Sequence, residues 1–152
     1  MFIKNEKKNW GSGIPKYNKN DLMTPEELYD FALDIVAQFE IKAHNCYKPI
    51  DCNPSKDSFP SMVVEAKGKL IFILVEADVA PKMPKLSNER KEAFLKHCKK
   101  HNAEAFYAAV GFGACDEERF NKSLALRGDA YYANYIGLEP LDGAILPYGN
   151  DA

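Results

Sequence analysis

The feature that most constrains the fold is an unbroken apolar run, Leu-Ile-Phe-Ile-Leu-Val, at residues 70–75. A strand with one face in solvent alternates apolar and polar side chains, whereas a strand covered on both faces is apolar throughout. We therefore expect this run to be an interior strand of a sheet with helices on both faces. Residues 61–66 also have strand character, and Lys67-Gly68 between the two runs predicts the tight turn of a hairpin.

Two helices are predicted by capping residues followed by apolar residues at helical spacing. Thr24 can cap the first helix, Pro25 fits its first position, and Glu27 can bond back to the cap. Apolar residues then recur at steps of three and four, which predicts one buried face and an end near residue 40. The residues predicted to face the core are Leu28, Phe31, Ala32, Ile35, Val36 and Phe39. Ser87 caps a second helix in the same way.

The remaining segments complete a mixed sheet. Residues 40–47 are predicted as a strand and residues 49–60 as a surface loop. Further strands are expected at 104–112 and 130–136, with a short helix at 116–122 between them. The fold class is therefore α/β, with a central mixed β-sheet flanked by helices in three layers.

Length and composition fit a single domain. The chain has 152 residues, of which 46% are hydrophobic and 28% charged, the proportions of an ordinary globular protein. We expect the α/β domain at 24–137, a basic arm at 1–23 and a polar tail at 138–152. No apolar run approaches the roughly 20 residues that cross a bilayer, which predicts a cytoplasmic protein without a membrane partner. The four cysteines lack Cys-x-x-Cys spacing, which predicts free thiols.

The element order α-β-β-β-α-β over residues 24–136 resembles the restriction-endonuclease-like, or PD-(D/E)XK nuclease, superfamily. The resemblance also draws on residues 60–85, which hold the hairpin and the segment after it. It implies an acid near the start of the second strand and an acid-x-lysine near the end of the third. In that superfamily these groups gather one or two magnesium ions and a water that attacks a phosphodiester, since hard cations prefer oxygen ligands.

This chain departs from the superfamily pattern at both places. Ser61 stands where the first acid is expected, and the third strand ends in Glu76-Ala77-Asp78. If Leu74 and Glu76 take the places of the acid and the lysine, both roles are lost. If Glu76 and Asp78 take them, the acid is kept. Either register lacks the catalytic lysine, so the resemblance is to a divergent member with a degenerate motif.

Glu76 and Asp78 are still candidates for a metal site, because residues two apart on a strand point to the same side. They could hold Mg²⁺ or Mn²⁺ together with Glu27, or with Asp57, as a third source of oxygen ligands. The alternative is that the strand has emerged into solvent, where acidic residues are common and protect sheet edges.

Lysines near this segment have two predicted roles. Lys82 or Lys85 could supply the ammonium group that the motif lacks, with Lys82 as the catalytic candidate. Lys82, Lys85 and Lys67 are also the candidate contacts to nucleic acid.

His97 and His101 lie four residues apart on the second helix and face the same way. Two histidines alone make a poor metal site. Because Lys96, Lys99 and Lys100 surround them, we expect a solvated helical face.

These observations predict a nuclease-like domain without ordinary metal-dependent cleavage, which acts as a binding module for nucleic acid or protein. The net charge of −2 argues against binding of nucleic acid through the overall charge of the protein alone. One alternative is an active phosphodiesterase that uses Mg²⁺ or Mn²⁺. Another is a protein-interaction or assembly domain, including a homo-oligomer, that never contacts nucleic acid.

Overall fold

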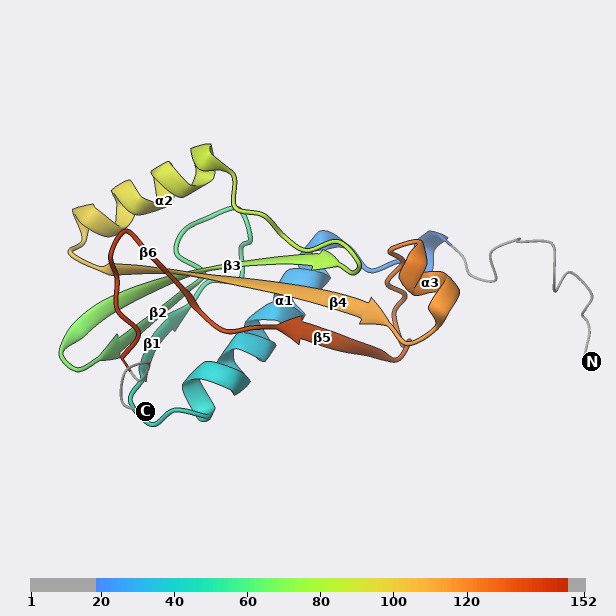
Figure 1. Cartoon of the computed structure of the whole chain (residues 1–152), viewed down its shortest axis with the longest axis horizontal. Coiled ribbons are helices and arrows are strands. Elements are labelled where there is room, and N and C mark those ends of the chain that lie inside the picture. Colours follow the sequence, from blue (N-terminus) through green and yellow to red (C-terminus); the bar gives the residue numbers. More distant parts are fainter. Residues whose placement is uncertain (1–18, 148–152) are drawn as a thin grey trace, which may run out of the picture.

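The structure is a computed structural model that describes residues 19–147 (Figure 1). The predicted basic arm lies outside the described residues except for its end, where Lys19–Asp21 form a 3₁₀ helix. One mixed sheet has helices on its opposite faces, which confirms the predicted α/β class with three layers.

The sheet has the strand order β1-β2-β3-β4-β5, and β6 pairs with β4 next to β5. β3 and β4 are parallel, whereas the other strand pairs of the described chain are antiparallel. The strands are β1 (Lys48–Cys52), β2 (Met62–Ala66), β3 (Lys69–Val79), β4 (Glu104–Ala114), β5 (Tyr131–Tyr135) and β6 (Glu139–Leu141). The helices are α1 (Pro25–Val36), α2 (Asn88–Lys100) and α3 (Glu117–Asn121).

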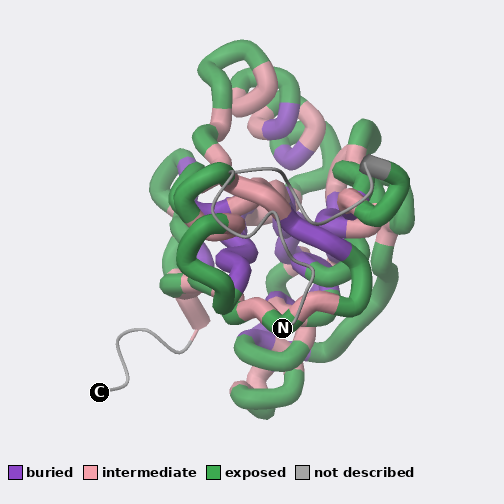
Figure 2. Tube along the Cα trace, turned by 90° about the vertical axis from the view of Figure 1, so that its right-hand side faces the viewer, coloured by how far each residue is buried: buried purple, intermediate pink, exposed green. Residues whose placement is uncertain are grey.

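β3 is the interior strand that its apolar run predicts. Ile71, Ile73 and Val75 pack in the apolar cluster under α1. Phe72 and Leu74, on the opposite face, pack in the cluster under α2. Each of these side chains is at most 5% exposed, so the run lacks polar residues because both its faces are covered. Figure 2 shows buried segments enclosed by exposed outer turns.

α1 begins with the predicted capping box. Thr24 Oγ1 accepts a hydrogen bond from the backbone N–H of Glu27 at 3.1 Å, and the Glu27 carboxylate accepts one from the N–H of Thr24 at 2.8 Å. The buried face of the helix, however, is rotated about the helix axis from the predicted face. Its residues are Leu28, Tyr29, Ala32, Leu33 and Val36. Two predicted core residues, Phe31 and Phe39, are instead 47% and 54% exposed.

The strand predicted at residues 40–47 is wrong. The chain continues from α1 into a π-helix, Ala37–Lys42, and the first strand follows later, overlapping the start of the segment predicted as a loop. β1 is an edge strand whose residues are all exposed. Its sequence contains Pro49 and Asp51, two residue types that are rare in strands, so the sequence does not predict a strand there.

The predicted boundary of the C-terminal tail is also wrong, because β6 belongs to the sheet. Leu141 pairs with Ala105 of β4, and Leu138 and Leu141 are both buried. A strand of three residues that begins just after Gly137 has too little sequence pattern to be recognised.

None of the described helices is long and apolar enough to cross a bilayer. The four cysteines are free thiols, as their spacing predicts.

Candidate functional site

Glu76 and Asp78 lie where β3 extends beyond its neighbour β2. β2 pairs with β3 only as far as Ile73, so the last residues of β3 have no strand beside them on that edge within the described chain. A cavity of 330 Å³ occupies this position. Its polar lining comes from α1, from the loop before β2, from β3, from the segment after β3 and from the start of α2. The polar lining residues are Tyr29, Lys56, Asp57, Glu76, Asp78, Lys85 and Arg90. We call it the Glu76 cavity.

Both carboxylate oxygens of Glu76 are engaged. The Tyr107 hydroxyl donates a 2.7 Å hydrogen bond to Oε1, and Arg90 Nε lies 2.9 Å from Oε2 in an ion pair. The Glu76 side chain is only 19% exposed, so these partners replace much of its hydration. Burial, followed by the hydrogen bond to Glu76, raises the pKa of Tyr107 well above its ordinary value.

Arg90 connects three elements around the Glu76 cavity. It lies in the first turn of α2, where its backbone N–H donates to the Ser87 cap at 3.1 Å. Its Nη2 donates to the Lys56 carbonyl at 3.0 Å, and its guanidinium carbon lies 5.4 Å from the ring centroid of Phe59. The ion pair with Glu76 adds β3. This arginine therefore fixes the loop before β2 and the start of α2 against the end of β3.

The two other acids of the cavity have local partners. Asp78 Oδ1 accepts a 2.7 Å hydrogen bond from the N–H of Val79. Asp57 is exposed and lies 3.0 Å from the ammonium of Lys56. The cavity thus combines carboxylates with cations, and neither sign of charge dominates.

Ser61, which the predicted resemblance puts at the place of the first acid, has a structural role. It is 1% exposed, and its hydroxyl accepts a 2.9 Å hydrogen bond from the N–H of Val75. Its own N–H donates to the carbonyl of Ile73 at 2.9 Å. Ser61 therefore satisfies the backbone of β3 at the point where β2 begins.

Glu27, the predicted third metal ligand, is held by other partners. Arg127 donates to both its oxygens, with distances of 2.7 and 2.8 Å, and the N–H of Thr24 donates to it as well. The described residues contain no group of three His, Cys, Asp or Glu side chains that could hold a metal ion. The structure therefore does not bring Glu27, Glu76 and Asp78 together, because the capping position of Glu27 directs its carboxylate to Arg127.

The predicted lysines lie at two ends of the sheet. Lys85 lines the Glu76 cavity, whereas Lys82 is exposed in the turn after β3 and is not among the lining residues. Lys67 forms the turn before β3, at the opposite end of this strand of 11 residues. The three lysines therefore do not form one surface.

Sequence reasoning missed Arg90 and Tyr107, the two partners of Glu76. The sequence gives a weak signal for Arg90. It is the only arginine of the second predicted helix, and it lies in the first turn after the Ser87 cap of that helix. Tyr107 brings a hydroxyl into a strand that is otherwise apolar around it, and in a parallel pair with β3 it lies near Glu76. The Tyr107 contact depends on that pairing and the Arg90 contact on the packing of α2 against the sheet, neither of which the sequence specifies.

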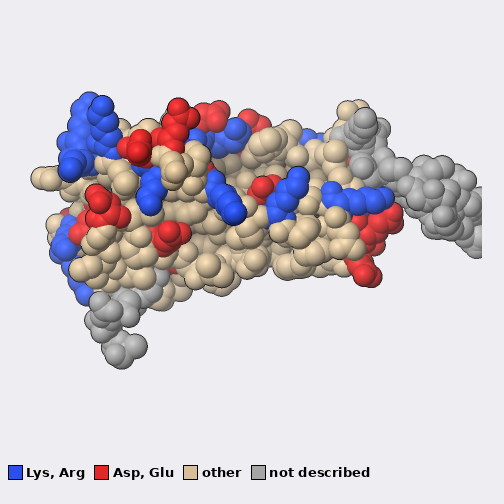
Figure 3. All heavy atoms as spheres, turned by 45° about the horizontal axis from the view of Figure 1, so that its top comes forward, with Lys and Arg blue, Asp and Glu red and all other residues tan. Residues whose placement is uncertain are grey.

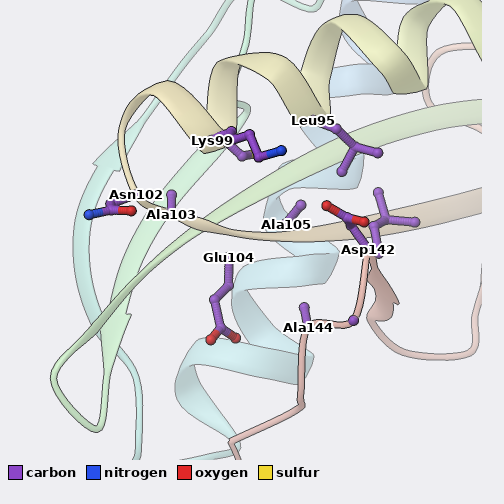
Figure 4. Close-up of a pocket in the computed structure, with 11 residues that line it drawn as sticks. Leu95, Lys99, Asn102, Ala103, Glu104, Ala105, Asp142 and Ala144 are labelled. Atoms are coloured by element: carbon purple, nitrogen blue, oxygen red, sulfur yellow. The ribbon is translucent and has the colours of Figure 1, made fainter.

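A second cavity, of 310 Å³, lies between the end of α2 and the turn after β6 (Figure 4). Lys99 and Asp142 point toward each other across the space beside Ala105. Cys98 also lines it, but burial raises the pKa of this thiol to about 12, so it is a poor nucleophile near neutral pH. The Glu76 cavity remains the candidate site.

Comparison with known families gives one match. The family described as "Domain of unknown function (DUF8840)" matches residues 26–141, from the first turn of α1 to the end of β6. No curated protein and no solved structure matches the chain. The matched segment covers the whole described sheet and every residue of the Glu76 cavity except Pro25. This chain belongs to the DUF8840 family.

Proposed function

We propose that this domain binds nucleic acid on a nuclease-like framework and does not cleave it. The order α1-β1-β2-β3-α2-β4 supports a relationship to the PD-(D/E)XK superfamily, as does a cavity at the end of β3. That relationship is part of the proposal.

The state of Glu76 is the observation that carries the proposal. A divalent cation needs several oxygen ligands, and it would be repelled by a guanidinium already in contact with the carboxylate. Arg90 and Tyr107 contact both oxygens of Glu76, and the Ser61 hydroxyl accepts a hydrogen bond from the backbone of β3. The groups that would assemble a metal-dependent nuclease are therefore used for structure.

Nucleic acid is supported as the partner by the uneven distribution of charge. Residues 96–101 contain three lysines and two histidines but no acid, although the whole chain has a net charge of −2. Figure 3 shows Lys and Arg side chains gathered at the end of the molecule where α2 ends. A local basic surface can bind a polyanion even when the net charge is negative.

The test combines binding with cleavage. Labelled DNA and RNA, single-stranded and duplex, are titrated with the full chain at about 50 mM salt, where phosphate contacts are strong. Fluorescence anisotropy should report binding that weakens steeply at about 200 mM salt. The same samples, incubated with excess Mg²⁺ or Mn²⁺, should show no cleavage on gels. Absence of binding to every probe would refute the proposal.

Glu76→Ala distinguishes the enzymatic alternative, with Glu26→Ala as the control for loss of an exposed acid. Cleavage by the wild type that Glu76→Ala abolishes and Glu26→Ala preserves would establish a phosphodiesterase. The proposal requires that none of the three proteins cleaves.

A second candidate function, assembly with another protein or another copy of this chain, is favoured by an exposed apolar strip. Phe31 and Phe39 lie eight residues apart along α1 and its π-helical extension, and the ring of Phe39 lies 6.3 Å from that of Tyr135 on β5. Ile136, next to Tyr135, is 90% exposed. Light scattering after gel filtration tests this candidate, which requires an oligomer or a co-purifying partner that Phe39→Glu removes.

A further inference from the structure

A hollow of 520 Å³ lies along one side of α2, next to the loop before β2, and it shares no lining residue with the Glu76 cavity. One lining residue, Phe59, comes from the loop before β2, and the others come from α2. The lining residues are Phe59, Ala93, Lys96, His97, Lys99 and Lys100. We call this surface the α2 face.

Aromatic rings form the floor of the α2 face. The ring centroid of His97 lies 6.2 Å from that of Phe59, 5.6 Å from that of Phe72 and 4.7 Å from that of His101. The guanidinium of Arg90 lies over the Phe59 ring. Because these rings hold one another in place, a planar ligand would meet a surface that is already ordered.

His97 presents an uncharged ring to the hollow. Burial lowers its pKa below the ordinary value of 6.5, and the neighbouring His101 and Lys100 lower it further. The imidazole is therefore mostly neutral at pH 7 and acts as a flat aromatic surface. The expectation of a merely solvated helical face is thus incomplete, because His97 is partly buried among other rings.

Three exposed lysines surround this floor, namely Lys96, Lys99 and Lys100. Within the described chain none of them forms an ion pair. Other lysines do lie against carboxylates, and these are Lys56, Lys69 and Lys122. The positive charge at the α2 face is therefore available to a ligand.

We propose that the α2 face binds nucleotides of single-stranded nucleic acid, with a base stacked on Phe59 and His97 and phosphates held by the three lysines. This proposal rests on the proposed function, because it assumes that the domain binds nucleic acid. It places the nucleic acid at the α2 face instead of at Lys82 and Lys85. A base in a single strand offers a free ring face, whereas the bases of a duplex are stacked on one another. The surface therefore selects single strands.

The first test compares two sets of surface lysines. Lys96→Ala/Lys99→Ala/Lys100→Ala removes the rim. Lys82→Ala/Lys85→Ala, which removes the lysines of the alternative location at the other end of β3, is the control for location. Anisotropy is measured with a labelled oligodeoxythymidine of about 12 nucleotides. The rim variant should bind at least about tenfold more weakly, with a salt slope shallower by about 2, whereas the control should stay within about twofold.

The second test separates stacking from charge. His97→Ala should weaken binding about tenfold, as expected for one lost base–aromatic stack, and His97→Phe should restore most of the affinity. Poly-L-glutamate matched in charge to the oligonucleotide should compete poorly, because it has no base. A duplex of the same sequence should bind more weakly than the single strand.

Each outcome decides between the proposals. If the wild type binds no nucleic acid, both the proposed function and the α2 face are refuted. If it binds, but Lys82→Ala/Lys85→Ala removes binding and the rim variant does not, only the α2 face is refuted. Equal competition by poly-L-glutamate would refute stacking. A titration with thymidine monophosphate, followed by the chemical shifts of residues 93–101, distinguishes a free nucleotide from a strand as the ligand. An affinity equal to that for the oligonucleotide would support a free nucleotide at this face. A much weaker affinity would support a strand.

Discussion

The carboxylate of Glu76 is held between two groups of different chemistry. Arg90 brings a positive charge and Tyr107 brings a neutral hydroxyl, and both lie within 2.9 Å of its oxygens. A carboxylate that has lost much of its hydration keeps its charge only with such partners. Loss of either partner should therefore change the stability of the fold.

Arg90→Ala should lower the free energy of unfolding by about 2 kcal/mol, because it leaves a partly buried carboxylate with one hydrogen bond and also removes the cation over Phe59. Lys91→Ala, which removes a cation from the next position of α2, should cost less than about 0.5 kcal/mol. Urea denaturation followed by circular dichroism measures both.

Glu76→Gln completes a double-mutant cycle with Arg90→Ala. The two changes should be less costly together than the sum of each alone, by about 1 kcal/mol, because they remove the same contact. Additive losses, or equal losses for Arg90→Ala and Lys91→Ala, would show that the ion pair does not stabilise the domain.

At the scale of elements, α1 is attached to the segment before β5 by the side chain of Glu27. Arg127 binds it through two nitrogens, and the N–H of Met23 donates to the Ala125 carbonyl at 2.8 Å beside this contact. The hydrogen bond from Arg127, followed by that from Thr24, lowers the pKa of Glu27 from 4.5 to about 2.

This lowered pKa predicts the direction of an acid effect. The unfolded chain takes up the proton near pH 4.5 and the folded chain only near pH 2, so the contribution of Glu27 is complete above pH 4.5 and is lost as the pH falls toward 2. Glu27→Gln should therefore lose less stability than the wild type over this interval. Thermal unfolding between pH 6 and pH 2 tests it, and equal slopes for the two proteins would contradict the assignment.

Three elements are each predicted by two agreeing signals. α1 and α2 have both a cap and a helical repeat, and β3 has both an apolar run and the Lys67-Gly68 turn. β1 and β6 have one signal or none, because an exposed edge strand and a three-residue strand are defined by their partners. Propensity could not reveal them, since tertiary pairing decides their conformation.

The candidate site was predictable only on β3. Glu76 and Asp78 follow the apolar run directly, so their place at the end of an interior strand could be inferred. Arg90 and Tyr107 reach Glu76 through the packing of α2 and the parallel register of β4, which no local pattern encodes. The prediction of Glu27 as a metal ligand conflicts with its spacing from Thr24, which indicates a capping role.

At the scale of the whole molecule, one edge of β4 is shared by two short strands. β6 pairs with Ala105–Tyr107 and β5 with Val110–Ala114, so two residues of β4 between them lack a partner on that edge in the described chain. Because no continuous ladder joins the two parts, we expect each to open without the other.

Hydrogen exchange should resolve the two parts in the wild-type protein. The pairing of β4 with β6 has three residue pairs, and that of β4 with β5 has five. Amides hydrogen-bonded between β4 and β6 should exchange about tenfold faster than those between β4 and β5, because fewer hydrogen bonds must break together. Mass spectrometry of peptides from β4 measures this, and the edge shared with β3 is the internal control. Uniform protection along β4 would contradict two separate openings.

Parallel neighbours cannot be joined by a tight turn, so the chain must pass over the sheet as α2 before β3 and β4 meet. The pairings of β1, β2 and β3 need no such passage and can form early. Phe106 of β4 belongs to the apolar layer under α1, and Tyr107 to the layer under α2. Because the arrival of β4 completes both layers at once, we expect them to close in one cooperative step that limits the rate of folding.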